Sequence, residues 1–531
     1  MTRQVSAAVI AVAVTAIYAL RIDPVAGLIV DDAWYIVLAK AIAQGDGYRL
    51  ISSATAQILP AFPPGFPAIL SVVFRASPEY PGNLWLLKSV SIVAMLGVGL
   101  VTYRYLVRYR SARPPLAAAV AISTVLSPAL VFLATSTVMA ECVFTLAQLG
   151  VVLVIERAAR AESAPRMQRD LCLAAVMAAG AVLLRSAGIA VVLAGAVYLV
   201  KARGWRWAMV FGAVVAACLT PWAVYANVHA PTRAERVAHG GSIAYTYDDL
   251  LTMRKGGYPT SGRASLDDLP ARVGVNLVNV FGRSVGAIIF PAAFRGSGES
   301  GQEVVALGGE TGLQAASMGG ATATVIVSLV ISAITLAGFV GIARQHFTLG
   351  EVFVPLSIGM IVLVPAPSFR YMLPLVPFVF FYFFAGLETI VSGFRRAGAH
   401  DPRPVMRIAA LCVTLLFGLE HAQYLWQLRV GPLPNWIEDH REVSELAGWM
   451  ERNLPATAAV ATTNPGLVYL LTSRTTVGSD DPEANWERWR TSGIRYVAAL
   501  RPAELPRAAL GYRLLYRSLG QGLWILELRS P

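Results

Sequence analysis

The chain has 531 residues, of which 56% are hydrophobic and only 14% charged, and its formal net charge is +12. Soluble domains contain about 45–50% apolar and about 25% charged residues, so this composition excludes an ordinary soluble protein and indicates a membrane protein. Lys and Arg lie mostly in short segments between apolar runs, as the positive-inside rule predicts. The positive charge therefore reflects membrane topology, and nucleic acid is not expected as a partner.

Cysteine and histidine show no metal-binding or disulfide pattern. The six histidines are scattered, without HExxH or any other paired spacing. The cysteines lie within or beside apolar stretches and have no CxxC spacing; they are Cys142, Cys172, Cys218 and Cys412. Neither a disulfide framework nor a zinc site is predicted.

The first apolar run, residues 5–20, is preceded by Arg3 and followed by Arg21 and Asp23. A secretory signal peptide has a similar pattern, but no convincing small-residue cleavage site follows this run. We interpret it as an uncleaved first helix. Either interpretation leaves the following loop outside.

Further apolar runs predict, together with the first, about eleven transmembrane helices, since a span needs roughly 20 apolar residues. They lie near residues 84–103, 115–135, 139–155, 171–184, 187–200, 208–228, 321–343, 349–366, 371–391 and 408–428. The stretch 171–200 is long for one span and short for two. Basic residues flank it on both sides and favour two short helices that meet outside near Arg185 and Ser186.

The same charge rule predicts a multi-pass protein of the inner (plasma) membrane with a cytoplasmic N-terminus and an extracytoplasmic C-terminus. Residues 1–428 form the predicted membrane domain, with outer loops 21–83 and 229–320. The second loop is rich in glycine and is expected to carry short surface helices.

Residues 429–531 have a soluble composition and predict a small extracytoplasmic α/β domain. Residues 443–454 show helical periodicity, and Asn464 and Pro465 suit the N-cap and first position of a second helix. Strand-like runs cover residues 458–460, 494–500, 512–517 and 523–528.

The first outer loop carries an acidic pair, Asp31 and Asp32, followed by Trp34 and Tyr35 and a helical pattern. The pattern ends at Gly45-Asp46-Gly47-Tyr48, and Phe62-Pro63-Pro64-Gly65-Phe66-Pro67 follows. Local rules alone allow a structural interpretation: one acid caps the helix, both favour its dipole, the aromatic pair forms a membrane belt, and the prolines form a rigid corner.

Three later charged residues lie at the ends of apolar runs. Glu141 ends the segment Ser136–Glu141, and an acid between apolar runs favours a polar cavity over hydrocarbon. Arg185 precedes Ser186-Ala187-Gly188, and Arg370 precedes Tyr371. Either arginine could be an interfacial anchor that snorkels to the membrane surface.

The first loop, the segments that contain Glu141, Arg185 and Arg370, and Pro221-Trp222 together resemble the GT-C glycosyltransferases in their order and topology. The resemblance is strongest to the branch that contains the protein O-mannosyltransferases and the lipid A aminoarabinose transferases. The resemblance implies a GT-C-like membrane fold and transfer of a sugar from a polyprenyl-phosphate carrier to an extracytoplasmic acceptor, which is a protein, a lipid or an envelope glycan. Membrane lipids are further expected partners.

The resemblance also implies roles for individual residues. Asp31, with Asp32 beside it, and Glu141 correspond to the acidic motifs, although relatives often have Asp-Glu or Asp-x-Asp at the first motif and a neighbouring Asp at the second. By the resemblance Asp31 is the expected base, and the choice between Asp31 and Asp32 stays open. Arg185 and Arg370 are expected to hold the donor phosphate. The expected substrate loop comprises Trp34, Tyr35, Tyr48, Pro63, Pro64, Gly65 and Tyr371.

The predicted chemistry suits these residue types. A lipid phosphate is already a good leaving group, so a carboxylate base and cations at the phosphate are sufficient, and single displacement inverts the anomeric centre. Repulsion within the acidic pair should raise one pKa. No tightly bound metal is expected, although the carboxylates could take Mg²⁺ or Mn²⁺. The alternative is a transporter or lipid flippase, but no duplicated halves are visible and the charged residues lie near the outer surface.

Overall fold

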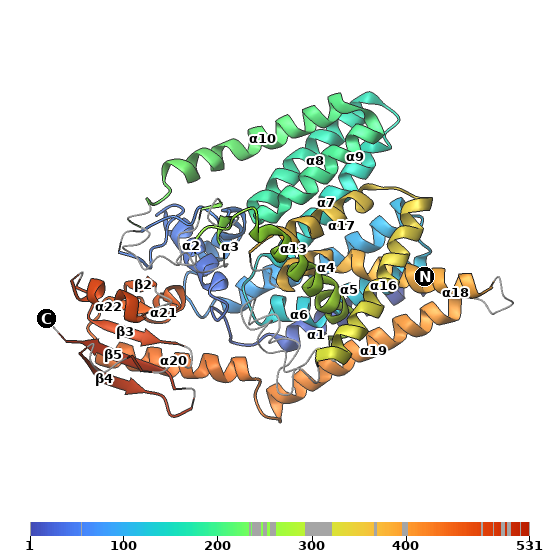
Figure 1. Ribbon diagram of the computed structural model, residues 1–531. Coiled ribbons are helices and arrows are strands. Elements are labelled where there is room, and N and C mark those ends of the chain that lie inside the picture. Colours follow the sequence, from blue (N-terminus) through green and yellow to red (C-terminus); the bar gives the residue numbers. More distant parts are fainter. Residues whose placement is uncertain are drawn as a thin grey trace.

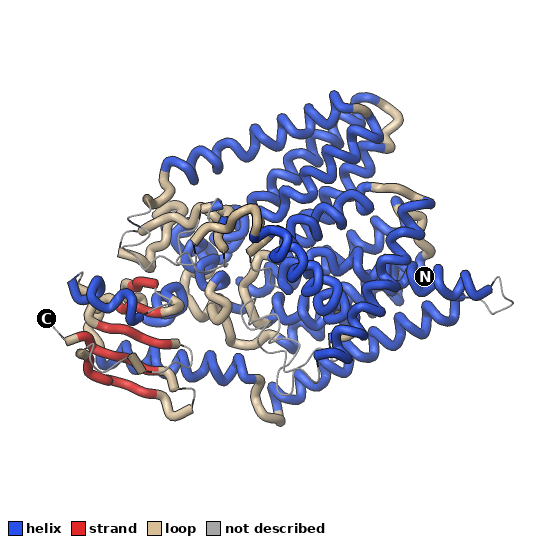
Figure 2. Tube along the Cα trace, in the orientation of Figure 1, coloured by secondary structure: helices blue, strands red, loops and turns tan. Residues whose placement is uncertain are grey.

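The computed structural model describes residues 2–54, 56–232, 262–291, 321–365, 369–395, 402–478, 482–491, 493–500, 511–520 and 522–529, with short pieces at 235, 246–247, 252–254 and 505–506. A helical bundle makes up most of this structure, and a small sheet domain lies at the C-terminal end of the chain (Figures 1 and 2). The chain is therefore a multi-pass helical protein with a C-terminal α/β domain, as the composition predicted.

Each predicted apolar run coincides with helical structure. Within the described residues, eight helices are long and apolar enough to cross a membrane, or nine if one bent pair counts as a span. The helices of the bundle are α1 (Thr2–Arg21), α4 (Leu84–Tyr109), α5 (Pro114–Val125), α6 (Pro128–Thr135), α7 (Glu141–Ala159), α8 (Ala164–Leu184), α9 (Ile189–Arg203), α10 (Trp205–Val228), α16 (Ala321–Gln345), α17 (Leu349–Leu363), α18 (Val376–Arg395) and α19 (Pro402–Arg429). The runs at α1 and α17 contain shorter apolar helices, so the predicted number of about eleven is roughly right.

The apolar runs are broken at two places, and one of the two breaks was predicted. The run 115–135 is bent by 46° between α5 and α6, where Pro128 lacks the amide hydrogen that would continue the first helix. The stretch 171–200 is indeed two helices that end and restart around Arg185 and Ser186. However, α8 already begins at Ala164 and is 21 residues long, so the prediction of two short helices was wrong for the first of them.

Helices α16 and α18 pack through two glycines. A Cβ atom on Gly338 would overlap the Tyr382 carbonyl oxygen, and one on Gly386 would overlap the Ile334 carbonyl oxygen. Small residues of this kind let membrane helices approach closely enough for backbone contact. The α16–α18 interface therefore depends on the absence of a side chain at both positions.

Replacing Gly386 with alanine should destabilise the protein by about 1–3 kcal/mol, because the new methyl group must push α16 away from α18. A lower midpoint of thermal unfolding in detergent or nanodiscs would show this. Gly359 is the matched control, since a Cβ there meets no heavy atom within 4 Å. Equal midpoints for the Gly386→Ala and Gly359→Ala proteins would contradict the predicted close packing.

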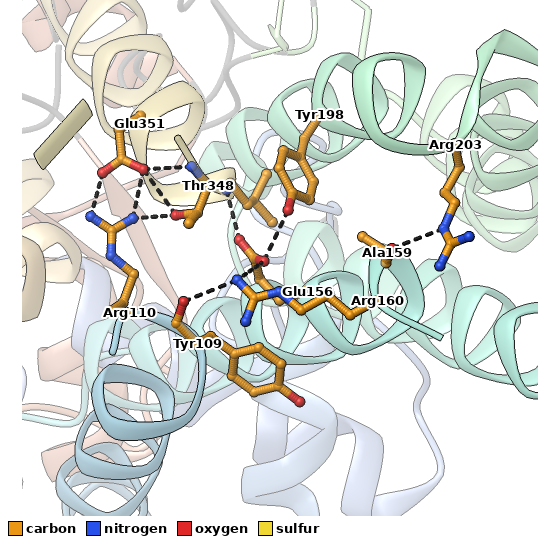
Figure 3. Close-up of polar contacts among 10 residues, drawn as sticks. Tyr109, Arg110, Glu156, Ala159, Arg160, Tyr198, Arg203, Thr348 and Glu351 are labelled. Carbon is orange, nitrogen blue, oxygen red and sulfur yellow. Dashed lines mark hydrogen bonds and ion pairs between the residues drawn. The ribbon is translucent and has the colours of Figure 1, made fainter. Parts of the chain in front are cut away.

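Residues assigned to the cytoplasmic side by the predicted topology contact one another at one end of the bundle (Figure 3). Arg110, after α4, donates two hydrogen bonds to Glu351 in the first turn of α17, at 2.6 and 2.5 Å. Glu156 near the end of α7 accepts from the Leu349 amide at 2.7 Å and from the Tyr198 hydroxyl on α9 at 3.0 Å. This buried polar network joins four helices at the end where their chain directions predict that they meet.

The opposite end of the bundle carries α2 (Asp31–Gln44) and α3 (Gly65–Ala76), and the C-terminal domain lies beside them, far from the N-terminal end of α1 (Figure 1). The second predicted outer loop, 229–320, lies largely outside the described residues. Its described part forms α13 (Asp268–Asn279), a π-helical turn (Val280–Ser284) and α14 (Val285–Ile289). All five residues of α14 are buried, so the expectation of surface helices was wrong there, because this segment packs against α16.

The C-terminal domain contains a five-stranded sheet of order β2-β1-β3-β5-β4. Its β1 pairs in parallel with β2 and β3, and β5 pairs antiparallel with β3 and β4. The elements are α20 (Asn435–Asn453), β1 (Val460–Thr462), α21 (Pro465–Thr472), β2 (Thr476–Gly478), α22 (Pro482–Thr491), β3 (Tyr496–Ala499), β4 (Tyr512–Arg517) and β5 (Trp524–Leu528). The predicted Asn464 cap is confirmed, but β2 and α22 were missed. The boundary between residues 428 and 429 stays a prediction.

Candidate active site

The acidic pair occupies the first two positions of α2, which ends at Gly45 in a left-handed conformation. Neither acid is the helix cap, because the residue before them is Val30 and no side-chain cap is present. The Asp32 carboxylate instead accepts hydrogen bonds from the backbone amides of Ala33, at 3.1 Å, and of Gly27, at 2.7 Å. The simple capping interpretation of this pair was therefore wrong.

A chain of alternating charges connects Asp31 to the other predicted site residues. Arg370 donates to Asp31 Oδ2 at 3.0 Å, and its other terminal nitrogen lies 3.6 Å from Glu141 Oε1. The same Glu141 oxygen lies 2.8 Å from Arg185 Nη1. Four residues that are far apart in the sequence thus form one cluster of two carboxylates and two guanidinium groups.

Each member of this cluster lies at the end of an element. Glu141 is the first residue of α7, where the helix dipole favours a negative charge. Arg185 lies at the break after α8, with extended backbone, and Arg370 lies in the 3₁₀ segment Phe369–Leu375 that precedes α18. Helix ends and breaks thus direct these polar side chains inward at the end of the bundle that carries α2 and α3.

The carboxylates differ in accessibility. The side chain of Asp31 is 32% exposed, whereas that of Glu141 is fully buried between the two arginines. Asp32 is only 1% exposed. Of these three acids, Asp31 is therefore the one that a molecule in solvent can contact.

Burial raises the pKa of Asp32 from 3.8 to about 6, and the nearby Asp31 charge adds to this rise, while the Gly27 amide opposes it. The predicted rise within the pair is therefore present. Its main cause is loss of water rather than like-charge repulsion.

The raised pKa of Asp32 makes stability depend on pH. The folded protein binds the Asp32 proton more tightly than the unfolded chain, so this contribution is fully present below about pH 4 and is lost as pH rises through about 6. Two pKa units correspond to roughly 3 kcal/mol. Between pH 4 and 7, the thermal midpoint of the wild type should fall further than that of the Asp32→Asn protein. Burial lowers the pKa of His440 to about 4 and gives the opposite trend, so only the difference between the two proteins isolates Asp32. Identical pH dependence would contradict the assignment.

The aromatic residues of the predicted substrate loop support its shape. Tyr35 is buried and packs edge-on against Phe62 and Phe66, with ring centroids 5.7 and 5.1 Å away. Trp34 is buried as well, so the expected aromatic belt is not formed by this pair. The Tyr48 hydroxyl donates to the Phe62 carbonyl oxygen at 2.5 Å. These contacts fold the chain after α2 back onto α2.

The Pro63-Pro64-Gly65 corner connects this loop to the break at Arg185. Pro64 immediately precedes α3, and a Cβ atom on Gly65 would lie 2.7 Å from the Leu183 carbonyl oxygen at the end of α8. The Tyr371 ring lies 5.9 Å from the Arg185 guanidinium, within the range of a cation–π contact. The structure thus brings most of the predicted loop residues to one end of the bundle, although their roles stay predictions.

The sequence did not predict the buried ion pair between Lys88 and Asp23. Lys88 on α4 and Asp23 are both fully buried, and their charged atoms are 2.9 Å apart. Ser136 and Tyr424 donate to the other oxygen of Asp23 at 2.5 and 2.7 Å. The detectable signal was a single lysine inside an apolar run, which is costly without a partner. This pair and its hydrogen bonds attach the chain just after α1 to α4, to the residue that follows α6, and to α19.

Among the described residues, no group of three or more His, Cys, Asp or Glu side chains is close enough to hold a metal ion. The nearest candidates are already engaged, since Glu141 faces two arginines and Asp32 accepts from two amides. These carboxylates do not form a shared oxygen cradle for Mg²⁺ or Mn²⁺. The expectation of no tightly bound metal stays a prediction.

Comparisons of the sequence with protein-family models and with curated proteins find no match. Solved structures do match over nearly the whole chain. ArnT from Cupriavidus metallidurans bound to undecaprenyl phosphate is 14% identical, with 98% of each chain covered and a TM-score of 0.54. The oligosaccharyltransferase AglB from Archaeoglobus fulgidus, in complex with an inhibitory peptide and a dolichol-phosphate, is 11% identical, with 92% of this chain and 69% of that chain covered and a TM-score of 0.54. Both are GT-C glycosyltransferases. The chain therefore has the GT-C fold that the motifs of its outer loops implied.

Proposed function

We propose that this protein transfers a sugar from a polyprenyl-phosphate carrier to an extracytoplasmic acceptor, with inversion at the anomeric carbon. The observation that carries the proposal is the cluster of one accessible carboxylate, Asp31, with two arginines at the outer end of a GT-C fold. The bound lipids of the two similar structures, undecaprenyl phosphate and a dolichol-phosphate, support a lipid-phosphate donor.

Asp31 is the proposed general base. The oxygen of an acceptor hydroxyl attacks the anomeric carbon, the bond from that carbon to the phosphate oxygen breaks, and the hydroxyl proton passes to Asp31. Asp31 is suited to this role because its carboxylate is partly exposed, whereas Asp32 is buried against backbone amides. Glu141, which the sequence grouped with the catalytic acids, is better placed to orient the arginines.

Arg370 and Arg185 are the proposed donor-phosphate ligands. Both guanidinium groups are mostly buried, so a phosphate beside them would interact in surroundings where water screens little. The departing polyprenyl phosphate gains negative charge as the sugar leaves, and two fixed cations stabilise that charge. Arg370 also contacts Asp31, so the same arginine lies next to both the proposed base and the proposed phosphate site.

We further propose that the N-terminus is cytoplasmic and that the C-terminal domain and the Asp31 cluster face the outside of the inner membrane. The basic residues at the far end of α7 support this orientation: Glu141 of the cluster is the first residue of this helix, whereas Arg157 and Arg160 lie at its other end, where Arg203 bonds to the Ala159 carbonyl oxygen (Figure 3). A reporter that works only in the cytoplasm should be inactive when it is fused after Pro531, and its activity would reverse the assignment.

Mass spectrometry of envelope glycolipids and glycoproteins, with and without this protein, tests the function and identifies the acceptor. A glycoform should disappear with the protein and return with the wild-type chain but not with the Asp31→Asn chain. Purified protein in nanodiscs would then be given polyprenyl phosphates carrying mannose, glucose, galactose or arabinose. An unchanged set of glycoforms and no turnover of any of these donors would refute the proposal.

A further inference from the structure

The backbone just before Asp31 is strained. Val30 has φ 69° and ψ −56°, and the Asp31 amide donates to the Ile29 carbonyl oxygen at 2.8 Å, which closes a three-residue turn around Val30. A β-branched residue rarely adopts a positive φ, and such a conformation costs about 1–3 kcal/mol. Such a conformation persists only where surrounding contacts hold the chain in place.

Gly27, three residues before Val30, is held from two sides. Its amide donates to Asp32 Oδ2 at 2.7 Å, and its carbonyl oxygen accepts from Asn464 Nδ2 at 2.5 Å. Gly27 has φ +87°, and a Cβ atom there would lie 2.7 Å from the Leu467 side chain. The turn that carries the acidic pair is therefore closed by Asp32 on one side and by the C-terminal domain on the other.

Asn464 uses both ends of its side-chain amide. Its oxygen accepts from the Leu467 amide at 3.2 Å and caps α21, which directs its NH₂ group at Gly27. The side chain is buried. A Cβ atom on Gly466 would lie 2.9 Å from Ala33 Cβ, so the start of α21 also contacts the first turn of α2 directly.

A second contact attaches the same domain to the first outer loop. The amide and the hydroxyl of Thr476, on β2, both donate to the Ser52 carbonyl oxygen, at 2.8 and 3.1 Å. Segments before and after α2 are thus both bonded to residues of the C-terminal domain. The C-terminal domain thus contacts this part of the chain at Gly27, at Ala33 and at Ser52.

We propose that the C-terminal domain positions the catalytic base, and that Asn464 is the positioning residue: it holds Gly27, which fixes the strained turn that orients Asp31. This inference rests on the proposed function. Asn464 acts through Gly27 and is expected to touch neither the sugar nor the phosphate. The arginines are positioned by Glu141, so loss of the Asn464 contact should reduce turnover and leave donor binding nearly unchanged.

The test uses the full-length Asn464→Asp protein in nanodiscs. Aspartate caps a helix as well as asparagine does, so α21 keeps its cap, but an ionised carboxylate cannot donate to the Gly27 carbonyl oxygen. Hydrogen–deuterium exchange at residues 24–34 should become about tenfold faster. With a polyprenyl-phosphate sugar that the wild type accepts, kcat should fall about 10–100-fold, since misplacement of about 1 Å can have this effect, while KM for the donor stays within about twofold.

Arg474→Lys is the matched control. Arg474 donates to carbonyl oxygens of its own domain, including those of Leu454 and Pro455, so its loss weakens the domain without touching residues 27–32. This variant should lower the thermal midpoint and leave both exchange at residues 24–34 and kcat per folded molecule unchanged. Equal losses of kcat in both variants, or unchanged exchange and kcat in Asn464→Asp, would overturn the proposal.

The outcomes separate this inference from the proposed function. If Asp31→Asn abolishes turnover and Asn464→Asp does not, only the positioning role fails. If the wild type turns over none of the donors, or Asp31→Asn retains turnover, the proposed function fails. The exchange measurement needs no substrate, so it decides in either case whether Asn464 holds the turn.

Discussion

Asp31→Asn should lower turnover about 10²–10⁴-fold, the range expected for loss of a general base, while donor binding changes little. Asparagine keeps the shape of aspartate and can still accept a hydrogen bond from Arg370, so the cluster should keep its geometry. It cannot take the proton of the attacking hydroxyl. The measurement is turnover of a polyprenyl-phosphate sugar by purified protein, together with a separate assay of undecaprenyl phosphate binding.

Two acids nearby serve as controls for this prediction. Asp46 is exposed at the other end of α2, and Asp46→Asn should leave turnover unchanged. Asp32→Asn should alter the pH dependence of stability more than it alters turnover, because Asp32 is buried against the Gly27 and Ala33 amides. Near-normal turnover in Asp31→Asn would move the catalytic role to Asp32 or Glu141, and activity in all three acid variants would refute a transferase that uses a carboxylate base.

Local patterns predicted the elements that depend on local physics. Apolar runs located the spans, and arginines on both flanks located the break at Arg185. The Asn464-Pro465 pair located the start of α21, because a cap and a proline act on the helix that immediately follows them. The short strand β2 was missed because three residues carry too little periodicity to distinguish a strand from a loop.

The contacts within the candidate site could not be predicted in the same way. Asp31 and Arg370 are 339 positions apart, and Asn464 is 437 positions from Gly27, so only the tertiary fold brings them together. The resemblance grouped Glu141 with the acids, but its burial between two arginines is visible only in three dimensions. The strain at Val30 has no sequence signal, since valine is an unfavourable residue for that conformation.

Buried ion pairs of arginine lie at both ends of the bundle. Arg110 and Arg370 are both buried arginines paired with carboxylates, but Arg110 follows the end of α4 and belongs to the network that joins α4 to α17 (Figure 3). Replacing either arginine disturbs a buried ion pair and should lower stability. Of these two arginines, Arg370 alone lies in the Asp31 cluster, where we propose that the donor phosphate binds.

Arg370→Lys should weaken binding of undecaprenyl phosphate about tenfold and lower kcat about 10²-fold. Lysine keeps the positive charge but loses the planar guanidinium group that allows Arg370 to face Asp31 and Glu141 at once. It therefore cannot contact both carboxylates and also donate a hydrogen bond to the phosphate. The effect on kcat is expected to be the larger one, because the phosphate gains charge as the sugar leaves and the missing contact matters most in the transition state.

Arg110→Lys is the structural control. It should lower the thermal midpoint about as much as Arg370→Lys does, but undecaprenyl phosphate should still raise that midpoint by the wild-type amount. In the Arg370→Lys protein this increase should be smaller. If both variants lose lipid binding equally, the loss follows from destabilisation. If Arg370→Lys binds and turns over the donor normally, the phosphate is held by another residue, and Arg185 is the next residue to replace.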